Sequence, residues 1–154
     1  MLVGVVHAGF TVSNLDRSVD WYCEVLGLEL LSRQRNDNEY TRLLVGMEDA
    51  VLEIAFFRLP GAGAPSGQVL ELMQYIAPTG SKPSLRTNDV GVGHFALAVD
   101  DLTAEYERLR DLGVRFRNPP VTVSEGLNKG KAACYLLDPD DITIELIQPA
   151  PAED

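Results

Sequence analysis

The sequence predicts an α+β fold in which one βαβββ module occurs twice in tandem. The first supporting observation is an internal repeat: residues 4–15 match residues 91–102 at one constant offset, through their Gly, His, Val and Leu positions. The second is a repeated ending, because residues 70–74 parallel residues 144–148. The third is the same order of patterns in each half: a strand-like stretch, an amphipathic stretch, then further strand-like stretches.

Each half places one helix directly after its first strand. The amphipathic stretches cover residues 15–26 and 102–112. A side-chain oxygen before a helix accepts hydrogen bonds from the free amides of its first turn, and a glycine after the helix tolerates the left-handed turn that ends it. The residues with these properties are Asn14 and Gly27 in the first half and, in the second, Asp100 or Asp101 together with Gly113.

Strand-like segments fill the rest of each half. They cover residues 28–33, 41–45, 51–58 and 69–76 in the first half and residues 114–117, 121–123, 132–137 and 142–147 in the second. The N-terminal stretch up to His7 also reads as strand, residues 60–67 read as a loop, and residues 138–141 read as a tight turn. We therefore expect a first module at residues 1–78, a linker at 79–90, a second module at 91–149 and a tail at 150–154, with the two modules forming one domain.

Composition argues against several classes of function. The chain has 154 residues, the usual size of one domain, and its 23 acidic and 13 basic side chains give a formal charge of −10. Such a field repels nucleic acid and anionic lipid, so we expect a small-molecule substrate and neither of those partners. The two cysteines form no CxxC pair, the N-terminus lacks a signal-peptide pattern, and no apolar run approaches the roughly 20 residues of a spanning helix. We expect a cytoplasmic protein without disulfides.

The two histidines of the chain occupy the same position in the two copies of the repeat. Strand alternation places His7 on the face that carries Gly9, and His94 on the face that carries Ala96. Small neighbours of this kind are expected where a sheet borders a cleft. A single histidine on a strand is more often a packed core residue, but the duplication in register favours a shared function.

Two carboxylates are duplicated in the same way. Glu71 and Glu145 each lie in the middle of an apolar strand, where an unpaired carboxylate is costly to bury. Two imidazoles and two carboxylates suit one divalent ion such as Zn, Ni, Co, Mn or Fe. We therefore expect the metal ligands His7, Glu71, His94 and Glu145 to converge on one site, with no other cofactor.

Both halves resemble the vicinal oxygen chelate superfamily, which contains glyoxalase I, methylmalonyl-CoA epimerase, extradiol dioxygenases and the bleomycin-resistance proteins. The segments that carry the resemblance are His7, 15–22, 26–28 and 70–72 in the first half, and 93–102, 138–140 and 144–146 in the second. The resemblance covers nearly the whole chain. The turn at 138–141 departs from the usual Asp-Pro-Asp-Gly by carrying Asp141, a residue that tolerates the left-handed conformation.

The resemblance implies a glyoxalase-like open half-barrel around a metal cleft. It also implies that the protein is an enzyme. Glyoxalase- and epimerase-like members use the position of Glu71 as a ligand, whereas extradiol dioxygenases resemble a set of His7, His94 and Glu145 alone. Glu71 therefore favours a metal-dependent lyase or isomerase that moves a proton next to a carbonyl through an enolate, with Glu145 or Glu71 as the catalytic base. The alternatives are a ring-cleaving dioxygenase and a non-catalytic, bleomycin-resistance-like binding protein.

Other expectations concern the substrate and the assembly. Thr11 and Tyr75 stand near places where glutathione-using members carry Arg and Asn, so glutathione is not the expected substrate. Glu53 is either a second acid or base or a carboxylate at the rim of the sheet. Residues 124–131, with two lysines, either close over an anionic substrate or form a solvated hairpin. Open sheets expose apolar surface, so we expect a homodimer; the modules pair within one chain or across two.

Overall fold

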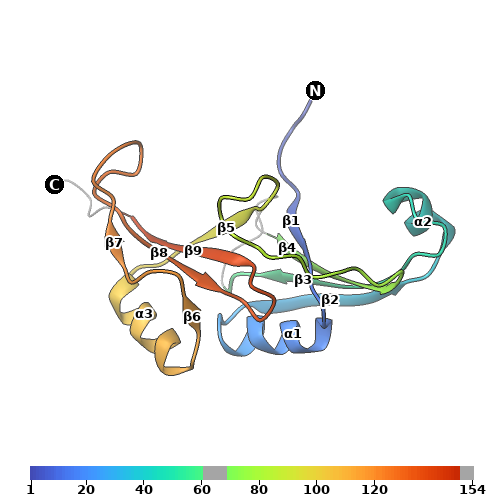
Figure 1. Ribbon diagram of the computed structural model, residues 1–154, viewed down its shortest axis with the longest axis horizontal. Coiled ribbons are helices and arrows are strands. Elements are labelled where there is room, and N and C mark those ends of the chain that lie inside the picture. Colours follow the sequence, from blue (N-terminus) through green and yellow to red (C-terminus); the bar gives the residue numbers. More distant parts are fainter. Residues whose placement is uncertain (61–68, 150–154) are drawn as a thin grey trace. The chain divides into compact units, whose positions relative to one another are not determined.

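The computed structural model describes residues 1–60 and 69–149, and these residues form two compact units, Met1–Pro83 and Ser84–Asp154 (Figure 1). The division falls inside the predicted linker 79–90. Most of the predicted loop 60–67 and the predicted tail 150–154 lie outside the described residues. None of the helices in the described part of the chain has the length and apolar character needed to cross a bilayer.

The sheet of the first unit has four strands in the order β1-β4-β3-β2. The strands are β1 (His7–Thr11), β2 (Glu29–Asn36), β3 (Val51–Arg58) and β4 (Val69–Ala77). β1 runs parallel to β4, whereas β4 with β3 and β3 with β2 are antiparallel. The parallel pair brings the first strand of the unit beside its last strand, so residues far apart in sequence become neighbours.

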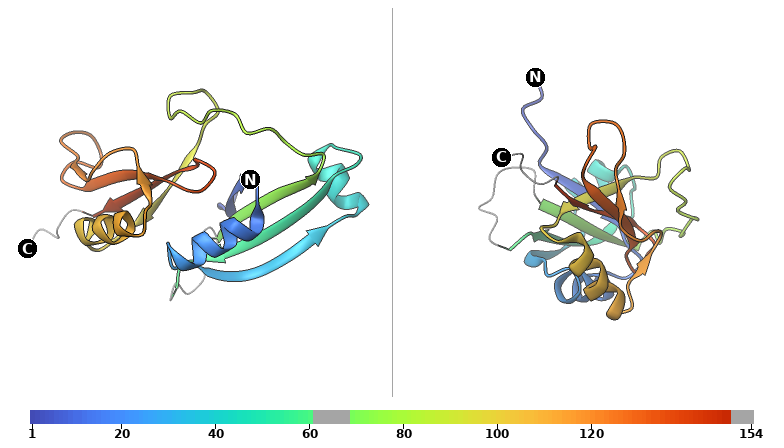
Figure 2. Two further views of the ribbon diagram at one scale, coloured as in Figure 1. Left: turned by 60° about the horizontal axis from the view of Figure 1, so that its bottom comes forward. Right: turned by 90° about the vertical axis from the view of Figure 1, so that its left-hand side faces the viewer.

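Helix α1 (Leu15–Glu24) covers one face of this sheet, as Figure 2 shows. The predicted cap is confirmed: the Asn14 side chain accepts a hydrogen bond from the amide of Arg17 at 2.9 Å. The buried Tyr22 ring packs 5.9 Å from that of Phe57 on β3. Since neighbouring residues of a strand face opposite sides, this contact leaves Phe56 and its neighbours on the other face.

The predicted strand at residues 41–45 is wrong, because the chain forms the short helix α2 (Glu39–Val45) there. The Asn38 side chain accepts from the amide of Thr41 at 2.9 Å, and Gly46 takes the left-handed conformation, with φ of 69°, that ends a helix. These two caps outweigh the strand propensity of Thr41 and Val45. Val45 packs against the buried cluster of Ala50, Leu52 and Ile54.

The second unit repeats this arrangement in a sheet whose strands are mostly shorter. Their order is β5-β9-β8-β6, and β7 also pairs with β8. Its strands are β5 (His94–Ala98), β6 (Arg115–Phe116), β7 (Val121–Thr122), β8 (Ala132–Leu137) and β9 (Thr143–Gln148). β5 is parallel to β9, as β1 is to β4. Of the two candidate caps, Asp101 caps helix α3 (Leu102–Asp111), accepting from the amide of Ala104 at 3.0 Å.

The glutamine that ends each copy of the repeat has the same role in both units, which is to accept a hydrogen bond from the start of a helix. The Gln74 side chain on β4 accepts from the amide of Leu15 at 2.7 Å, and the Gln148 side chain on β9 accepts from the amide of Leu102 at 2.9 Å. Each bond satisfies a free amide in the first turn of a helix and ties that helix to the last strand of its own unit.

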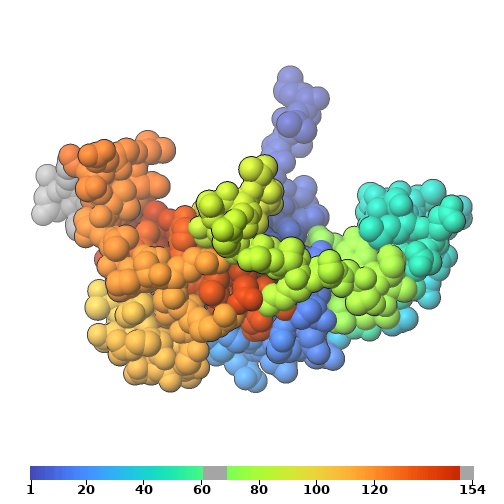
Figure 3. Space-filling model, viewed as in Figure 1, coloured from blue at the N-terminus to red at the C-terminus, as the bar shows by residue number. Residues whose placement is uncertain are grey.

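The N-terminal stretch does not form the predicted strand before His7. Residues 1–6 have no strand pairing with the described residues, and their large apolar side chains are exposed. Figure 3 shows this segment standing away from the rest of its unit. In the described structure, ladder pairing of β1 begins where His7 meets Val69, the first residue of β4. A strand without a partner for its amides and carbonyls has little to hold it extended.

The predicted tight turn at residues 138–141 is confirmed. Asp138 is buried, and its carboxylate accepts from the amides of Asp140 and Ile142 at 2.8 Å each. Asp141 has a φ of 68°, the left-handed conformation that glycine would adopt more readily. The two cysteines are free, and Cys134 is buried.

Candidate functional site

The first unit brings His7 and Glu71 together on the sheet face opposite α1. Register places Glu71 beside Gly9, two residues along β1 from His7, so the two side chains share one face. His7 Nε2 lies 3.2 Å from Glu71 Oε2. The Glu71 side chain is 12% exposed and that of His7 42% exposed, so a mostly buried carboxylate meets an accessible imidazole.

The second unit forms the same pair from His94 and Glu145. Here Glu145 lies beside Ala96, again two residues along the parallel strand from the histidine. His94 Nε2 lies 3.4 Å from Glu145 Oε2, with side chains 47% and 19% exposed. The repeat seen in the sequence is therefore a repeat of strand register, and it generates the same donor pair twice.

The donor atoms of each pair fit the coordination of one metal ion. Nitrogen and oxygen ligands lie about 2.0–2.2 Å from a zinc-like ion, so two ligands of one ion at tetrahedral or octahedral angles are about 3.0–3.4 Å apart. The separations of 3.2 and 3.4 Å agree with this range. Among residues 1–60 and 69–149, no three His, Cys, Asp or Glu side chains gather in a metal-binding group. The structure thus brings the four predicted ligands together as two pairs, one in each unit.

An aromatic residue on the adjacent antiparallel strand accompanies each pair. Phe56 on β3 lies beside Glu71, and its ring centroid is 6.2 Å from that of His7. Tyr135 on β8 lies beside Glu145, and its ring centroid is 5.3 Å from that of His94. Burial, and then the charge of Glu145, raise the pKa of the Tyr135 phenol, which therefore stays protonated and able to donate a hydrogen bond at neutral pH.

Arg117 adds a guanidinium to this face of the second unit. Its guanidinium donates from Nε to Thr143 Oγ1 at 3.3 Å, and Thr143 lies beside His94. Sequence reasoning missed Phe56, Tyr135 and Arg117. Alternation predicts the face of a residue within its own strand, but which residue lies beside it on the next strand depends on the pairing register.

Glu53 does not belong to the site. It lies on β3 next to Ile54 and faces the opposite side of the sheet from Phe56 and Glu71. Its carboxylate accepts from Arg33 at 2.9 Å and from Arg35 at 3.5 Å. These ion pairs give Glu53 a structural role, but the expected place at the edge or rim of the sheet is wrong, because β3 is an inner strand between β4 and β2.

Residues 124–131 form a hairpin between β7 and β8. The amide of Val123 donates to the carbonyl of Lys131 at 2.8 Å, and the amide of Gly130 donates to the carbonyl of Val123 at 2.9 Å. Lys131 Nζ donates to Asn128 Oδ1 at 2.8 Å within the same turn. The structure therefore agrees with the solvated-hairpin alternative.

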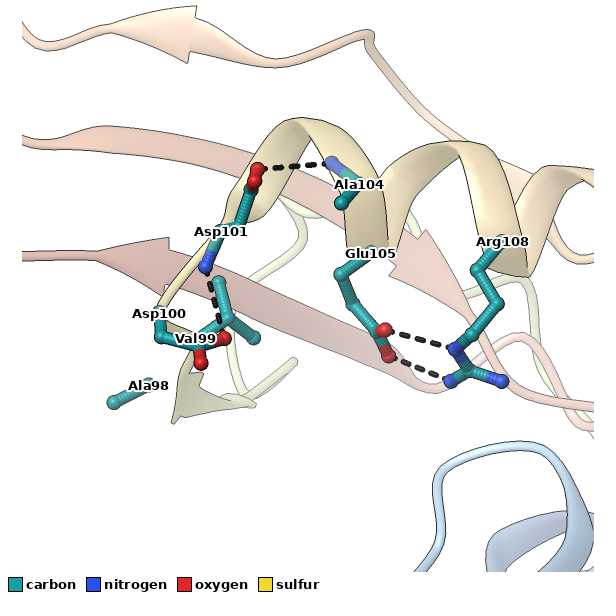
Figure 4. Close-up of a pocket in the computed structure, with 7 residues that line it drawn as sticks. All are labelled: Ala98, Val99, Asp100, Asp101, Ala104, Glu105 and Arg108. Atoms are coloured by element: carbon teal, nitrogen blue, oxygen red, sulfur yellow. Dashed lines mark hydrogen bonds and ion pairs between the residues drawn. The ribbon is translucent and has the colours of Figure 1, made fainter.

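A hollow of about 510 Å³ lies at the start of α3 in the second unit (Figure 4). It is lined by Ala98, Val99, Asp100, Asp101, Ala104, Glu105 and Arg108. Its polar side chains serve the helix: Asp101 caps it, and Glu105 pairs with Arg108 at 2.6 Å. Neither His94 nor Glu145 lines this hollow.

Comparison with known proteins agrees with this duplicated architecture. The sequence profile of the Glyoxalase/Bleomycin resistance protein/Dioxygenase superfamily matches residues 4–146. The chain is 36% identical over 151 residues to a 2-epi-5-epi-valiolone epimerase of an Actinomyces species, covering 94% of this chain and 79% of that protein. It is 31% identical over 149 residues to a probable lactoylglutathione lyase of Vibrio parahaemolyticus, covering 94% and 89%.

A solved structure supports the same conclusion for the fold. The crystal structure of a glyoxalase family protein from Bacillus cereus superposes with a TM-score of 0.80 at 21% identity, covering 98% of this chain and 97% of that one. The predicted α+β, glyoxalase-like fold is thereby confirmed. With a profile that spans nearly the whole length and relatives above 30% identity, the chain belongs to the Glyoxalase/Bleomycin resistance protein/Dioxygenase superfamily, the vicinal oxygen chelate superfamily that its repeat resembles.

Proposed function

We propose that this protein is a metal-dependent epimerase or lyase that moves a proton next to the carbonyl of a small α-oxygenated substrate. The observation that carries the proposal is the His–Glu pair formed twice by the same parallel register. Each unit buries a carboxylate in mid-strand, which is costly, and places it beside an imidazole. The nitrogen and oxygen atoms lie 3.2 and 3.4 Å apart in the two pairs, and such atoms are the donors of a metal centre.

One divalent ion, either Zn, Ni, Co, Mn or Fe, would be held by His7, Glu71, His94 and Glu145. When bound, such an ion supplies Lewis-acid stabilisation for the negative charge that develops on a substrate oxygen, worth several kcal/mol. The presence of Glu71 gives a fourth ligand and favours proton-transfer chemistry over ring cleavage.

The carboxylates of the chain provide the acid–base groups. Glu145, or Glu71, would remove the proton next to the substrate carbonyl and return it to the enolate. Inversion at a carbon requires removal of the proton from one face and delivery to the other. A chain that supplies one carboxylate in each module therefore has enough groups for an epimerase.

The relatives suggest which substrates to try. The more similar of the two reported relatives is named as an epimerase of 2-epi-5-epi-valiolone, and the other as a probable lactoylglutathione lyase. Thr11 and Tyr75 stand near the places where glutathione-using members carry Arg and Asn. We therefore favour the epimerase reaction on a small oxygenated carbonyl compound.

We also propose a homodimer that works in the cytoplasm. Helix α2 exposes the apolar side chains of Tyr40, Leu43 and Leu44, which are 69–75% accessible in the isolated chain. Exposed apolar surface of this kind is typical of an association surface. Light scattering after size-exclusion chromatography tests the dimer directly, because a molar mass near 16.9 kDa would contradict it.

Elemental analysis of the purified protein is the direct test of the metal centre. We expect close to one divalent ion per chain in the native protein and a large loss in Glu71→Ala and in Glu145→Ala. Glu48→Ala is the matched control, because it removes an exposed carboxylate from the same unit as Glu71. Absence of metal in all four proteins, even after reconstitution, would overturn the proposal. Iron or manganese that survives loss of Glu71 would instead indicate a dioxygenase.

Activity assays then separate the reaction classes. The metal-loaded protein would be incubated in deuterated water with 2-epi-5-epi-valiolone and, separately, with lactoylglutathione, the compounds in the relatives' names. Inversion with uptake of deuterium at the carbon next to the carbonyl supports the epimerase. Oxygen consumption with a catechol, and no proton exchange with either compound, would contradict it.

A further inference from the structure

The two units can be compared row by row across their sheets, because register aligns the residues that lie side by side on neighbouring strands. The row through the carboxylate of the first unit contains Gly9, Glu71, Phe56 and Ser32. The corresponding row of the second unit contains Ala96, Glu145, Tyr135 and Arg117. The first two positions are alike, whereas the last two change from an apolar ring and a small hydroxyl to a phenol and a guanidinium.

Arg117 is held at this position by contacts to neutral groups. Its backbone amide donates to the carbonyl of Tyr135 at 2.8 Å, which continues the row beyond the short strand β6. Its side chain donates from Nε to Thr143 Oγ1 at 3.3 Å and from Nη2 to the carbonyl of Leu85 at 2.7 Å. Thr143 is 1% exposed, so one of these acceptors is anchored in the body of the unit.

These contacts place the guanidinium on the face of the His94–Glu145 pair. Thr143 lies directly beside His94, and it is two residues from Glu145 on the same strand, so all three side chains share one face. Arg117 reaches Thr143 across that face from the far edge of the sheet. The residue has a guanidinium with five N–H donors, and the two side-chain bonds use two of them.

Arg117 differs from most other arginines of the chain in the partners of its guanidinium. Eight arginines form ion pairs with carboxylates: Arg33, Arg35, Arg42, Arg58, Arg86, Arg108, Arg110 and Arg115. Within the described residues, Arg117 has no carboxylate at ion-pair distance, and the chain has a net charge of −10. An arginine that has no carboxylate partner among the described residues, and that is held on the face of the His94–Glu145 pair, is able to bind an anion.

We propose that Arg117 binds an oxyanionic group of the substrate, a carboxylate or a phosphate, beside the His94–Glu145 pair. The inference rests on the proposed function, because it takes that pair as part of the substrate site. Arg117 is then the residue that sets specificity for a charged substrate, and the second module is the one that recognises it. Since 2-epi-5-epi-valiolone carries no charge, the inference takes over the proposed reaction class and not that compound as the substrate. The first module, with Ser32 and Phe56 in the corresponding places, lacks this group.

The test is a nuclear magnetic resonance titration of the ¹⁵N-labelled protein with inorganic phosphate, with sulfate and, for the carboxylate, with acetate. We expect saturable shifts of the Arg117 Nε–H signal and of the Thr143 and Tyr135 amides. Phosphate and sulfate acting alone would identify a phosphate-like group, and acetate acting alone would identify a carboxylate. Absence of saturable shifts with all three anions would overturn the inference.

Two variants show whether Arg117 itself binds the anion. Arg117→Gln is expected to weaken binding at least tenfold, and Arg117→Lys to restore part of it, because lysine keeps the charge without the planar pair of donors. Arg115→Gln is the matched control: it removes an arginine two residues away whose guanidinium pairs with Asp141 at 2.6 Å. Equal binding by the native protein and Arg117→Gln would contradict the inference, and a native-like spectrum of each variant excludes misfolding as the cause.

Metal content measured on the same samples separates this inference from the proposed function. Arg117→Gln is expected to keep the metal of the native protein while it loses the anion. If the native protein holds no metal but Arg117 still binds phosphate or acetate, the proposed function fails and the anion site stands. If metal is bound and Arg117→Gln leaves anion binding unchanged, the anion site fails and the proposed function stands.

Discussion

Gly9 makes the space in which the Glu71 carboxylate lies. The two residues are neighbours across the β1–β4 pair, and a Cβ atom on Gly9 would stand 3.0 Å from Glu71 Oε2 and 3.5 Å from the terminal methyl of Met73. A methyl group at 3.0 Å from a carboxylate oxygen forces one of them to move. The absence of a side chain at Gly9 therefore leaves room for the carboxylate beside His7.

We predict that Gly9→Ala weakens metal binding by roughly tenfold or more, the usual effect of disturbing a residue that orients a ligand. The displaced carboxylate leaves the 3.2 Å geometry that it forms with His7. Isothermal titration of the metal-free protein with Zn²⁺ measures the change. Ala96→Gly is the control, since it removes the corresponding methyl group in the second unit, and its affinity should stay within about twofold. Equal affinity of Gly9→Ala and the native protein would show that Glu71 is not constrained by this contact.

A second prediction concerns the helix caps. Asn14→Ala and Asp101→Ala each remove the side-chain oxygen that accepts from an amide in the first turn, at 2.9 and 3.0 Å. Each substitution should lower the free energy of unfolding by about 1 kcal/mol. Urea denaturation followed by circular dichroism measures this. Asp20→Ala, an exposed position inside α1, is the control and should change stability by less than about 0.5 kcal/mol.

The third prediction concerns Asp141, the residue in the left-handed conformation. Asp141→Ala should lower the free energy of unfolding by about 1–2 kcal/mol, because alanine is strained at a φ of 68° and loses the contact with Arg115. Asp141→Gly loses the same contact but relieves the strain, so it should be more stable than Asp141→Ala by about 1 kcal/mol. Thermal unfolding of the two variants side by side decides the matter. An alanine variant as stable as the glycine variant would mean that the backbone is not strained there.

The fourth prediction is a loss of stability at alkaline pH. Burial, and then the charge of Glu145, raise the pKa of the Cys134 thiol from its ordinary 9.0 to about 11. Between these values the unfolded chain releases the thiol proton and the folded chain keeps it, so the free energy of unfolding falls as pH rises from 9 to 11.

Urea denaturation at several pH values tests this, with Cys134→Ala as the comparison. The alanine variant is less stable at every pH, because it leaves a small cavity, but its stability should fall less steeply between pH 9 and 11 than that of the native protein. Parallel profiles for the two proteins would rule out a contribution from Cys134. The same buried, protonated thiol should react slowly with iodoacetamide at pH 8.

Several elements could be predicted because their signals are local. Asn14 and Gly27 bracket α1 in sequence as they do in the structure, and β3 and β8 have the predicted limits of 51–58 and 132–137. The face of each metal-ligand candidate follows from simple alternation along one strand. These features depend on residues a few positions apart, which a single sequence displays.

The elements that could not be predicted depend on competing local signals or on pairing with a distant strand. At residues 41–45, β-propensity competed with the caps Asn38 and Gly46, and the caps prevailed. Before His7, an apolar pattern suggested a strand, but a strand needs a neighbour. The arrangement of Arg117 beside Tyr135 depends on the register between β6 and β8, which no pattern within either strand reveals.

The parallel pairing of the first and last strands has a consequence for how each module folds. His7 and Glu71 are separated by 64 positions in the chain, and His94 and Glu145 by 51. Closing a loop of either length costs more chain entropy than closing a hairpin, so we expect these contacts to form late in folding. A ligand of either pair then binds the folded chain and stabilises it by mass action.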